Sequence, residues 1–216
     1  MKKYALILIT VLLAGAVRAQ KYEKNILGIR AGVNVSKYDI SAEDMQISTG
    51  SRAGFNFAVT DQVLLHRSLP LYIETGVGFS SLGSRAAAPI YDQIETMTMR
   101  PFYLQVPLLV NYHFLIGGLV TIQPFAGVYG GVGVRGMMKT QYGSEDLFGD
   151  RGILSRMDFG VRAGVGFVVR RIYLGINYDI GCRDQFRGGD FFYYTLRPES
   201  AEIRNNSLTV SIGYNF

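Results

Sequence analysis

The sequence predicts an all-β fold, an eight-stranded antiparallel up-and-down transmembrane β-barrel. The first observation behind this prediction is that apolar and polar residues alternate in eight segments of the chain. The second is segment length, about ten residues or more, whereas strands of soluble proteins average about five or six. The third is that the links are alternately long and short, as in outer-membrane barrels with short periplasmic turns and longer external loops.

The clearest pair of segments spans residues 157–182. Successive side chains of a strand point to opposite faces, so every second residue shares a face. Each half of this stretch has one apolar face and one polar or small face, and Arg170 and Arg171 separate the halves. We therefore expect two long strands joined by a very tight turn. The apolar positions are Met157, Phe159, Val161, Ala163, Val165, Phe167, Val169, Ile172, Leu174, Ile176, Tyr178 and Ile180.

Six further segments repeat this pattern, at residues 26–36, 52–64, 69–81, 100–114, 121–135 and 207–216. Long polar links at 37–51, 82–99, 136–153 and 183–206 alternate with short links at 66–68, 116–118 and 170–171. This alternation predicts that the N- and C-termini are both periplasmic. Pro107 and Pro124 lie inside predicted strands. Because proline removes a ladder hydrogen bond, we expect a bulge or local irregularity at each.

The apolar face of the eight segments carries no charged residue, which suits contact with lipid. Aromatic residues on this face gather toward both ends of the strands, in the two-girdle pattern of a membrane barrel. Toward the outer end these residues are Phe55, Phe79, Phe102 and Phe159. Toward the inner end they are Tyr112, Phe114, Phe167, Tyr214 and Phe216.

The N-terminus reads as an export signal. Lys2 and Lys3 precede an apolar stretch, and small residues end at Ala19, so we expect residues 1–19 to be a cleaved signal peptide and residues 20–216 to form the barrel. Without Lys2, Lys3 and Arg18, 19 of the 22 basic residues remain against 17 acidic ones, so the charge gives no case for nucleic acid. The single cysteine, Cys182, allows no intramolecular disulfide, and the alternating pattern places it on the lipid-facing side.

The opposite, inward face carries charged residues. An eight-stranded barrel is just wide enough for its own side chains, and buried charges must be paired. We therefore expect a structural ion-pair network that plugs the lumen, with Arg162 and Asp158 on one face of one strand as a plausible pair. The competing interpretation is a selective pore lined by positive charge. The predicted network residues are Arg30, Arg52, Glu74, Arg156, Asp158, Arg162, Asp179 and Arg183.

The sequence offers no catalytic, metal-binding or cofactor-binding group of residues. His66 falls in a predicted periplasmic turn and His113 faces inward near the periplasmic end, and neither accompanies a serine and a carboxylate at the outer rim. Residues 131–136 match G-x-G-x-x-G, but they lie in a strand with no helix opening after them. We therefore expect a protein that is not an enzyme and has no cofactor.

Several motifs together resemble a known family. These are GIRAGVNVS at 28–36, FYLQVPLLVNYHF at 102–114, INYDIG at 176–181 and RNNSLTVSIGYNF at 204–216. They are similar to the PorT-like outer-membrane barrels of the Bacteroidetes, and the YLQVP stretch at 103–107 is the most specific of them. The resemblance implies an integral outer-membrane barrel and an accessory role in type IX protein secretion. The terminal Tyr214 and Phe216 are similar to the signal read by the barrel-assembly machinery.

The sequence thus predicts a structural or assembly component of the outer membrane, with membrane lipid, the assembly machinery and secretion-system proteins as partners. Two alternatives stay open. One is a small passive channel or porin. The other is an adhesion-type protein that binds through its surface loops, with the aromatic run Phe191, Phe192, Tyr193 and Tyr194 as the contact site.

Overall fold

The computed structural model describes residues 23–42, 48–66, 69–90, 93–140, 143–148, 152–187 and 201–216. The predicted signal peptide at residues 1–19 and the aromatic run at residues 191–194 lie outside these ranges. Every regular element of the described chain is a strand. The same residues contain no helix long and apolar enough to cross a membrane.

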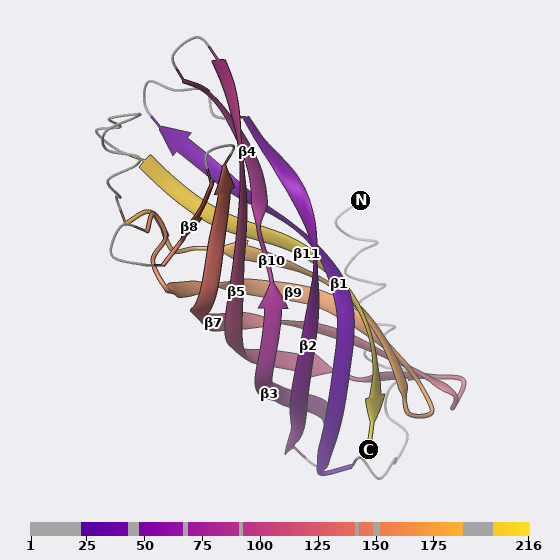
Figure 1. Cartoon of the computed structure of the whole chain (residues 1–216). Helices are drawn as coiled ribbons and strands as arrows, with labels where there is room; N and C mark the ends of the chain where they lie inside the picture. The colour runs from indigo at the N-terminus through magenta and orange to yellow at the C-terminus, as the bar shows by residue number, and fades with distance from the viewer. Residues whose placement is uncertain are drawn as a thin grey trace, which may run out of the picture.

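Eight long antiparallel strands form a closed ring (Figure 1). In ring order, each strand pairs with the next and β11 pairs with β1, so no edge of the ring is left free. The predicted fold class and strand number are confirmed. The strands are β1 (Asn25–Ala42), β2 (Ser48–His66), β3 (Leu69–Ser81), β5 (Gln93–Tyr112), β7 (Val120–Thr140), β9 (Met157–Val169), β10 (Ile172–Gly181) and β11 (Ala201–Asn215).

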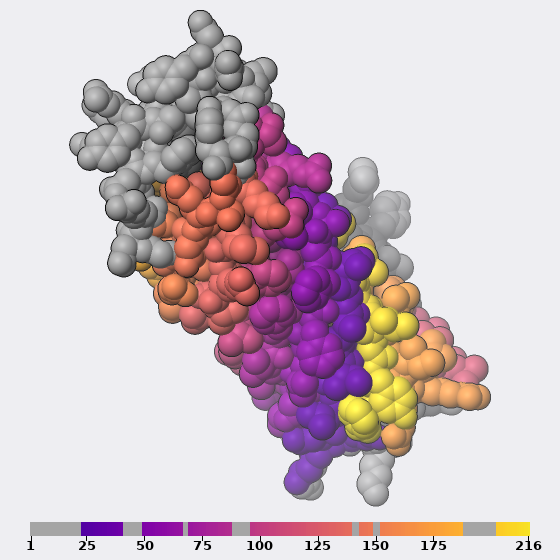
Figure 2. All heavy atoms as spheres, in the orientation of Figure 1, coloured from indigo at the N-terminus to yellow at the C-terminus, as the bar shows by residue number. Residues whose placement is uncertain are grey.

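The closing pair joins the two ends of the fold. In Figure 2 the yellow side chains of β11 lie directly against the indigo side chains of β1. Following the strand register once around the ring from Gly28 leads back to Tyr38, ten residues further along β1. Such a stagger requires the strands to tilt against the barrel axis, as in other closed barrels.

Three short strands extend the ring. β4 (Ser84–Ile90) pairs with β2 and β5 beyond a break at Leu82 and Gly83, and β6 (Phe114–Ile116) continues the β5 ladder on β7. β8 (Gly143–Asp146) forms a hairpin with β7. All four long links were therefore predicted too long, since parts of 37–51, 82–99, 136–153 and 183–206 are strand. Serine, arginine and alanine at 84–88 weaken the apolar alternation there, although neighbouring strands still satisfy the backbone.

The two faces of the ring differ as predicted. Outward side chains are apolar and exposed in the isolated chain, with Val33 63% and Ile212 60% accessible, whereas the lumen holds mainly buried polar residues. Toward the loop end, the rings of Phe55, Phe79 and Phe102 lie 5.7–6.4 Å apart, centroid to centroid. At the other end, Tyr112 lies 4.5 Å from Phe114, and Tyr214 lies 5.2 Å from Phe216. Aromatic groups therefore mark both ends of the apolar wall.

Both prolines interrupt pairing without shifting it, which confirms the expected irregularity. The β3–β5 ladder pairs Thr75 with Leu108 and Gly78 with Gln105 and omits Pro107, in one register. The Thr75 hydroxyl donates to the Pro107 carbonyl oxygen at 2.9 Å. Pro124 lies in the unpaired stretch of the ladder between the Asn111–Phe125 pair and the Phe114–Ile122 pair. The register shifts of the sheet lie elsewhere, at 64–66 and 102–103.

The chain ends and the tightest turns lie at one end of the ring. Gly28 near the start of β1 pairs with Asn215 at the end of β11. At the same end, Arg170 with φ 59° turns the chain from β9 to β10, and Gly117 with φ 61° and Gly118 with φ 74° turn it from β6 to β7. Glycine adopts positive φ without steric cost. The extra strands β4 and β8 lie at the opposite end (Figure 1).

A closed ring of strands should resist detergent at room temperature. We predict that unheated protein runs on a denaturing gel with a mobility different from boiled protein, since only heating opens a ring without a free edge. Identical mobility before and after boiling would contradict a closed barrel.

Candidate functional site

The lumen is the only part of the described chain where polar and charged side chains gather in a buried setting. It has two parts. The "polar lumen" comprises the buried polar residues on the inward faces of the strands. The "apolar cap" lies above it at the loop end and comprises Tyr38, Leu82, Ala86, Met97, Met99, Tyr103, Met138, Leu147, Phe148, Ile153, Leu154 and Ile203.

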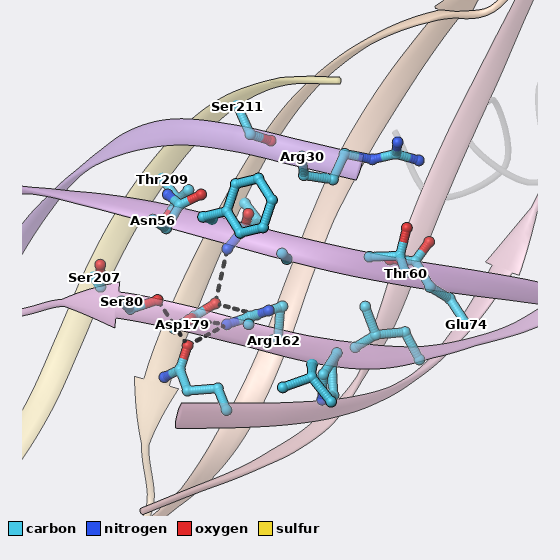
Figure 3. A pocket seen from close by; sticks show the side chains of 18 of the residues that line it. Arg30, Asn56, Thr60, Glu74, Ser80, Arg162, Asp179, Ser207, Thr209 and Ser211 are labelled. Carbon is cyan, nitrogen blue, oxygen red and sulfur yellow. Dashed lines mark hydrogen bonds and ion pairs between the residues drawn. The ribbon is translucent and has the colours of Figure 1, made fainter. Parts of the chain in front are cut away.

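An ion pair bridges the middle of the polar lumen (Figure 3). Arg162 on β9 and Asp179 on β10 are paired residues, and the guanidinium donates to both carboxylate oxygens, at 2.8 Å from Nε and 2.7 Å from Nη2. Nη2 also donates to Gln105 Oε1 at 3.2 Å, on β5 across the lumen. Ser80 on β3 donates to the same Gln105 oxygen at 3.1 Å. Four strands are therefore linked through the centre of the barrel.

Two other charged groups of the lumen have neutral partners. Glu74 accepts hydrogen bonds at Oε2 from the amides of Gln62 and Asn111. The Arg30 guanidinium lies 3.8 Å from the centre of the Tyr173 ring, and its Nη1 donates to the carbonyl oxygen of Ile29 at 3.1 Å. Cation–π contact and hydrogen bonds to neutral groups thus stabilise charges here in addition to ion pairing.

The end of the lumen near the termini is filled by aromatic rings. Tyr72 stacks on His113 with 4.0 Å between ring centroids, and the Tyr72 hydroxyl donates to the carbonyl oxygen of Glu23 at 3.1 Å. His113 is buried here, as the sequence predicted. Its nearest ring partner is a tyrosine, so the position favours packing over proton transfer.

The apolar cap closes the opposite end. Phe148 lies flat against the wall, where a β-carbon added to Gly133 would come within 2.3 Å of its ring. The Tyr103 ring meets Phe148 edge to face at 5.7 Å, and the Tyr103 hydroxyl donates to Gln185 at 3.1 Å. Backbone hydrogen bonds hold the cap segments together, for example from Leu154 N–H to the carbonyl oxygen of Leu147 at 3.0 Å.

Sequence reasoning missed this cap. Leu147, Phe148 and Ile153 fall in the link predicted at 136–153 and Leu154 directly follows it, and all four are at most 2% exposed. Two short apolar pairs within a polar, glycine-rich stretch were the available signal. Residues that fold back over a barrel do not alternate, so strand periodicity could not reveal them.

The predicted network residues occupy different settings. Arg162 and Asp179 form the ion pair, while Asp158 is buried beside Tyr129, whose hydroxyl lies 3.5 Å from Oδ2. Arg52 donates to the carbonyl oxygen of Leu82 at 2.8 Å. The exposed Arg156 donates to the carbonyl oxygen of Gly133 at 3.0 Å, and Arg183 is exposed. Within the described ranges these eight residues therefore do not join into one continuous network.

A small cavity of about 70 Å³ remains in the polar lumen (Figure 3). Since one water needs about 10–15 Å³ of such a cavity, there is room for a few water molecules. Its walls combine apolar side chains with hydroxyl and amide groups around the central ion pair. The hydroxyl and amide residues include Asn56, Thr60, Ser80, Ser207, Thr209 and Ser211. No group of three His, Cys, Asp or Glu residues able to hold a metal ion occurs in the described part of the chain.

The central ion pair should contribute strongly to stability. Its side chains are 18% and 6% exposed, and removing one partner of a buried pair costs about 3–5 kcal/mol because the other charge stays buried. We predict that Arg162→Ala lowers the temperature at which the folded gel band disappears. The double variant Arg162→Met with Asp179→Leu should recover part of the loss.

The control is Arg204→Ala, which breaks a pair with Glu202 whose side chains are 51% and 57% exposed. Exposed pairs contribute about 0–1 kcal/mol, so this variant should melt like the parent protein. If Arg162→Ala were as heat-resistant as the control, the lumen would be wet and screened, and the pore interpretation would regain support.

Comparison with known proteins agrees with this architecture. A family model described as "outer membrane protein beta-barrel domain" matches residues 19–187. Among solved structures, the outer membrane protein OprG of Pseudomonas aeruginosa is 12% identical with a TM-score of 0.50, covering 92% of this chain and 99% of its own. Neisserial surface protein A is 14% identical with a TM-score of 0.46, covering 88% and 97%. A search of curated proteins found no match.

The family match extends over most of the chain and includes β1 to β10 of the ring. The all-β closed ring and its apolar outer wall agree with that match on independent, physical grounds. The protein therefore belongs to the outer membrane protein beta-barrel domain family and is an integral protein of the outer membrane.

Proposed function

We propose that this protein is a non-enzymatic, non-conducting barrel that acts as a structural or assembly component of the outer membrane. One observation carries the proposal: the Arg162–Asp179 pair and Gln105 bridge the lumen beneath the apolar cap. A solute path would need a continuous wet passage. Here the centre is crossed by side chains, and the loop end is closed by residues such as Leu154 and Tyr103 with no accessible surface.

A filled lumen leaves the outer wall and the loop end as the surfaces available to partners. The wall is apolar and meets lipid, while the loop end carries the hairpins formed by β4 with β5 and by β7 with β8. In this proposal lipid, the barrel-assembly machinery and other outer-membrane proteins are the partners. Tyr214 and Phe216, exposed at the end of β11, suit recognition during assembly.

We further propose an accessory role in type IX protein secretion. The support is the resemblance to PorT-like barrels, strongest at residues 103–107. The inward residues of this stretch each contact another part of the barrel. Tyr103 joins the apolar cap, Gln105 accepts hydrogen bonds from Arg162 and Ser80, and the Pro107 carbonyl accepts from Thr75.

We also propose that both termini are periplasmic. The support is the shape of the links, because outer-membrane barrels have their short turns on the periplasmic side and their longer loops outside. The turns at Arg170 and at Gly117 lie at the same end as the paired Gly28 and Asn215.

Orientation can be tested with protease on intact cells. We predict that cleavage occurs only at the loop end, because the outer membrane shields the periplasmic turns from added enzyme. A protease site inserted between Gly117 and Gly118 should be cut in lysed cells but not in intact ones. Cutting at that site in intact cells would reverse the orientation.

Measurements of conduction and of secretion distinguish the proposed assembly component from a porin. Folded protein reconstituted in planar bilayers should give no steady current, and liposomes containing it should not swell in sugar solutions. Deleting the gene should impair the export or surface display of type IX substrates without a nutrient phenotype.

Replacing Phe191 and Phe192 with Ser tests the loop-binding alternative, and part of the secretion defect should reappear if that loop contacts a partner. Steady currents together with normal secretion would favour the porin.

A further inference from the structure

Four basic residues gather on the outward face of three neighbouring strands at the loop end. They are Arg85 on β4, Arg100 on β5, and Arg135 and Lys139 on β7. Arg85, Arg135 and Lys139 are exposed and Arg100 is half-buried. The intervening residues Met97, Met99 and Met138 are at most 2% exposed, so the strand alternation places the basic side chains on the outer wall.

The strand register brings these four residues together. Arg85 and Lys139 both pair with Thr98, one from each side, and Arg100 pairs with Met137. Arg100 is thus a diagonal neighbour of Arg85 on β4 and of both Lys139 and Arg135 on β7. Diagonal neighbours on one face are about 7–8 Å apart between Cα atoms, within reach of such long side chains. We call this group the "basic patch".

None of the four basic side chains forms an ion pair with a carboxylate of the described residues, although Asp146 is a diagonal neighbour of Arg135 and Lys139. Arg52 on β2 lies near enough to Arg100 and Arg85 to add to their repulsion. Asp146 lies on β8 opposite Met137, and its Oδ1 accepts the backbone N–H of Phe148 at 2.8 Å. No ion pair joins any of the four basic side chains to a carboxylate in the described chain.

The rim of the barrel around β1 and β11 is different. There Lys37 lies 3.7 Å from Asp39, and Arg204 lies 2.9 Å from Glu202. These residues also lie on the outward face, as their exposed positions between buried neighbours show. Lys37 and Arg204 on this rim are therefore each ion-paired within the protein, whereas the four cations of the basic patch, with Asp146 as a diagonal neighbour, are not.

The position of the basic patch along the strands identifies the layer of the membrane that it faces. Phe102 pairs with Arg135 and stacks on Phe79, so the patch begins at the aromatic girdle. Arg100 lies one outward position beyond Phe102, which is about 7 Å further along a strand. Aromatic girdles lie at the headgroup level of a membrane. The side chains of the patch therefore reach lipid headgroups, not the hydrocarbon layer.

We propose that the basic patch binds the phosphate groups of the phosphorylated glycolipid in the outer leaflet. This choice of leaflet rests on the proposed orientation, with the loop end outside. Arginine suits phosphate because its planar fork can donate two parallel hydrogen bonds, and lysine adds a point charge. Acyl chains of the same lipid would lie against the apolar wall below, beside Phe79 and Phe102.

The test uses the full protein in detergent micelles and measures bound lipid by native mass spectrometry. The probes are bis-phosphorylated lipid A, the same lipid after phosphatase treatment, and phosphatidylglycerol. The patch variant is Arg100→Gln with Lys139→Gln, and the matched variant is Lys37→Gln with Arg204→Gln, which removes equal charge from the paired rim. Each basic residue near headgroups contributes about fivefold to affinity, so the patch variant should bind phosphorylated lipid A about 25-fold more weakly.

The matched variant should keep the parent affinity, and Arg100→Lys with Lys139→Arg should keep most of it. Folding of every variant is checked by the gel shift on heating. Unchanged affinity of the folded patch variant, or an equal loss in the matched variant, would overturn the site. Equal binding of dephosphorylated lipid A or of phosphatidylglycerol would overturn the glycolipid assignment. These results are independent of orientation and conduction, which the protease and current measurements test separately.

Discussion

Pairing of β1 with β11 is the interaction on which the rest of the structure depends. A membrane interior offers no water to backbone N–H and C=O groups, so a sheet can cross it only as a closed ring. The two strands pair from Gly28 with Asn215 to Ala42 with Ala201. Without this contact both strands would expose unpaired edges to lipid. Only in a closed ring does the alternation place apolar residues against lipid and polar residues in a lumen.

Closure then determines what the interior can contain. With eight strands the polar faces meet at short distance, so each charged group must find a partner within the lumen. The structure does this in three ways: Arg162 with Asp179, Arg30 with an aromatic ring, and Glu74 with amides. The remaining space is small enough for water and too interrupted for solute flow. Function is therefore proposed for the outside of the barrel, where lipid and partner proteins can reach it.

Strand periodicity predicted most of the wall from the sequence alone. Residues 69–81 were predicted with the bounds that β3 has, and Pro107 interrupts the ladder as expected, because both depend on local rules. The lumen was predicted less well. The position of Arg162 in the alternating pattern of its strand predicted that its side chain faces the lumen. Whether that side chain contacts Asp158 or Asp179 depends on the register between neighbouring strands. The partner turned out to be Asp179 on the adjacent strand.

The apolar cap and the basic patch were beyond sequence reasoning for a related reason. Leu147 and Phe148 return to the barrel from a segment without strand periodicity, so only the fold shows that they enter the mouth. Arg85, Arg100 and Lys139 come from three strands, and the register alone makes them neighbours. Contacts between distant segments depend on the closed sheet, which no local pattern encodes.

The flat contact of Phe148 with Gly133 and Gly136 has a consequence for relatives of this protein. The two glycines form a socket, since any β-carbon there would strike the ring. A relative with larger residues at both positions could not seat an aromatic ring against its wall, so its mouth would need another closure or would stand open. The residue types at these two positions, with an aromatic residue in the following loop, therefore give a criterion for sorting sealed from open barrels by sequence.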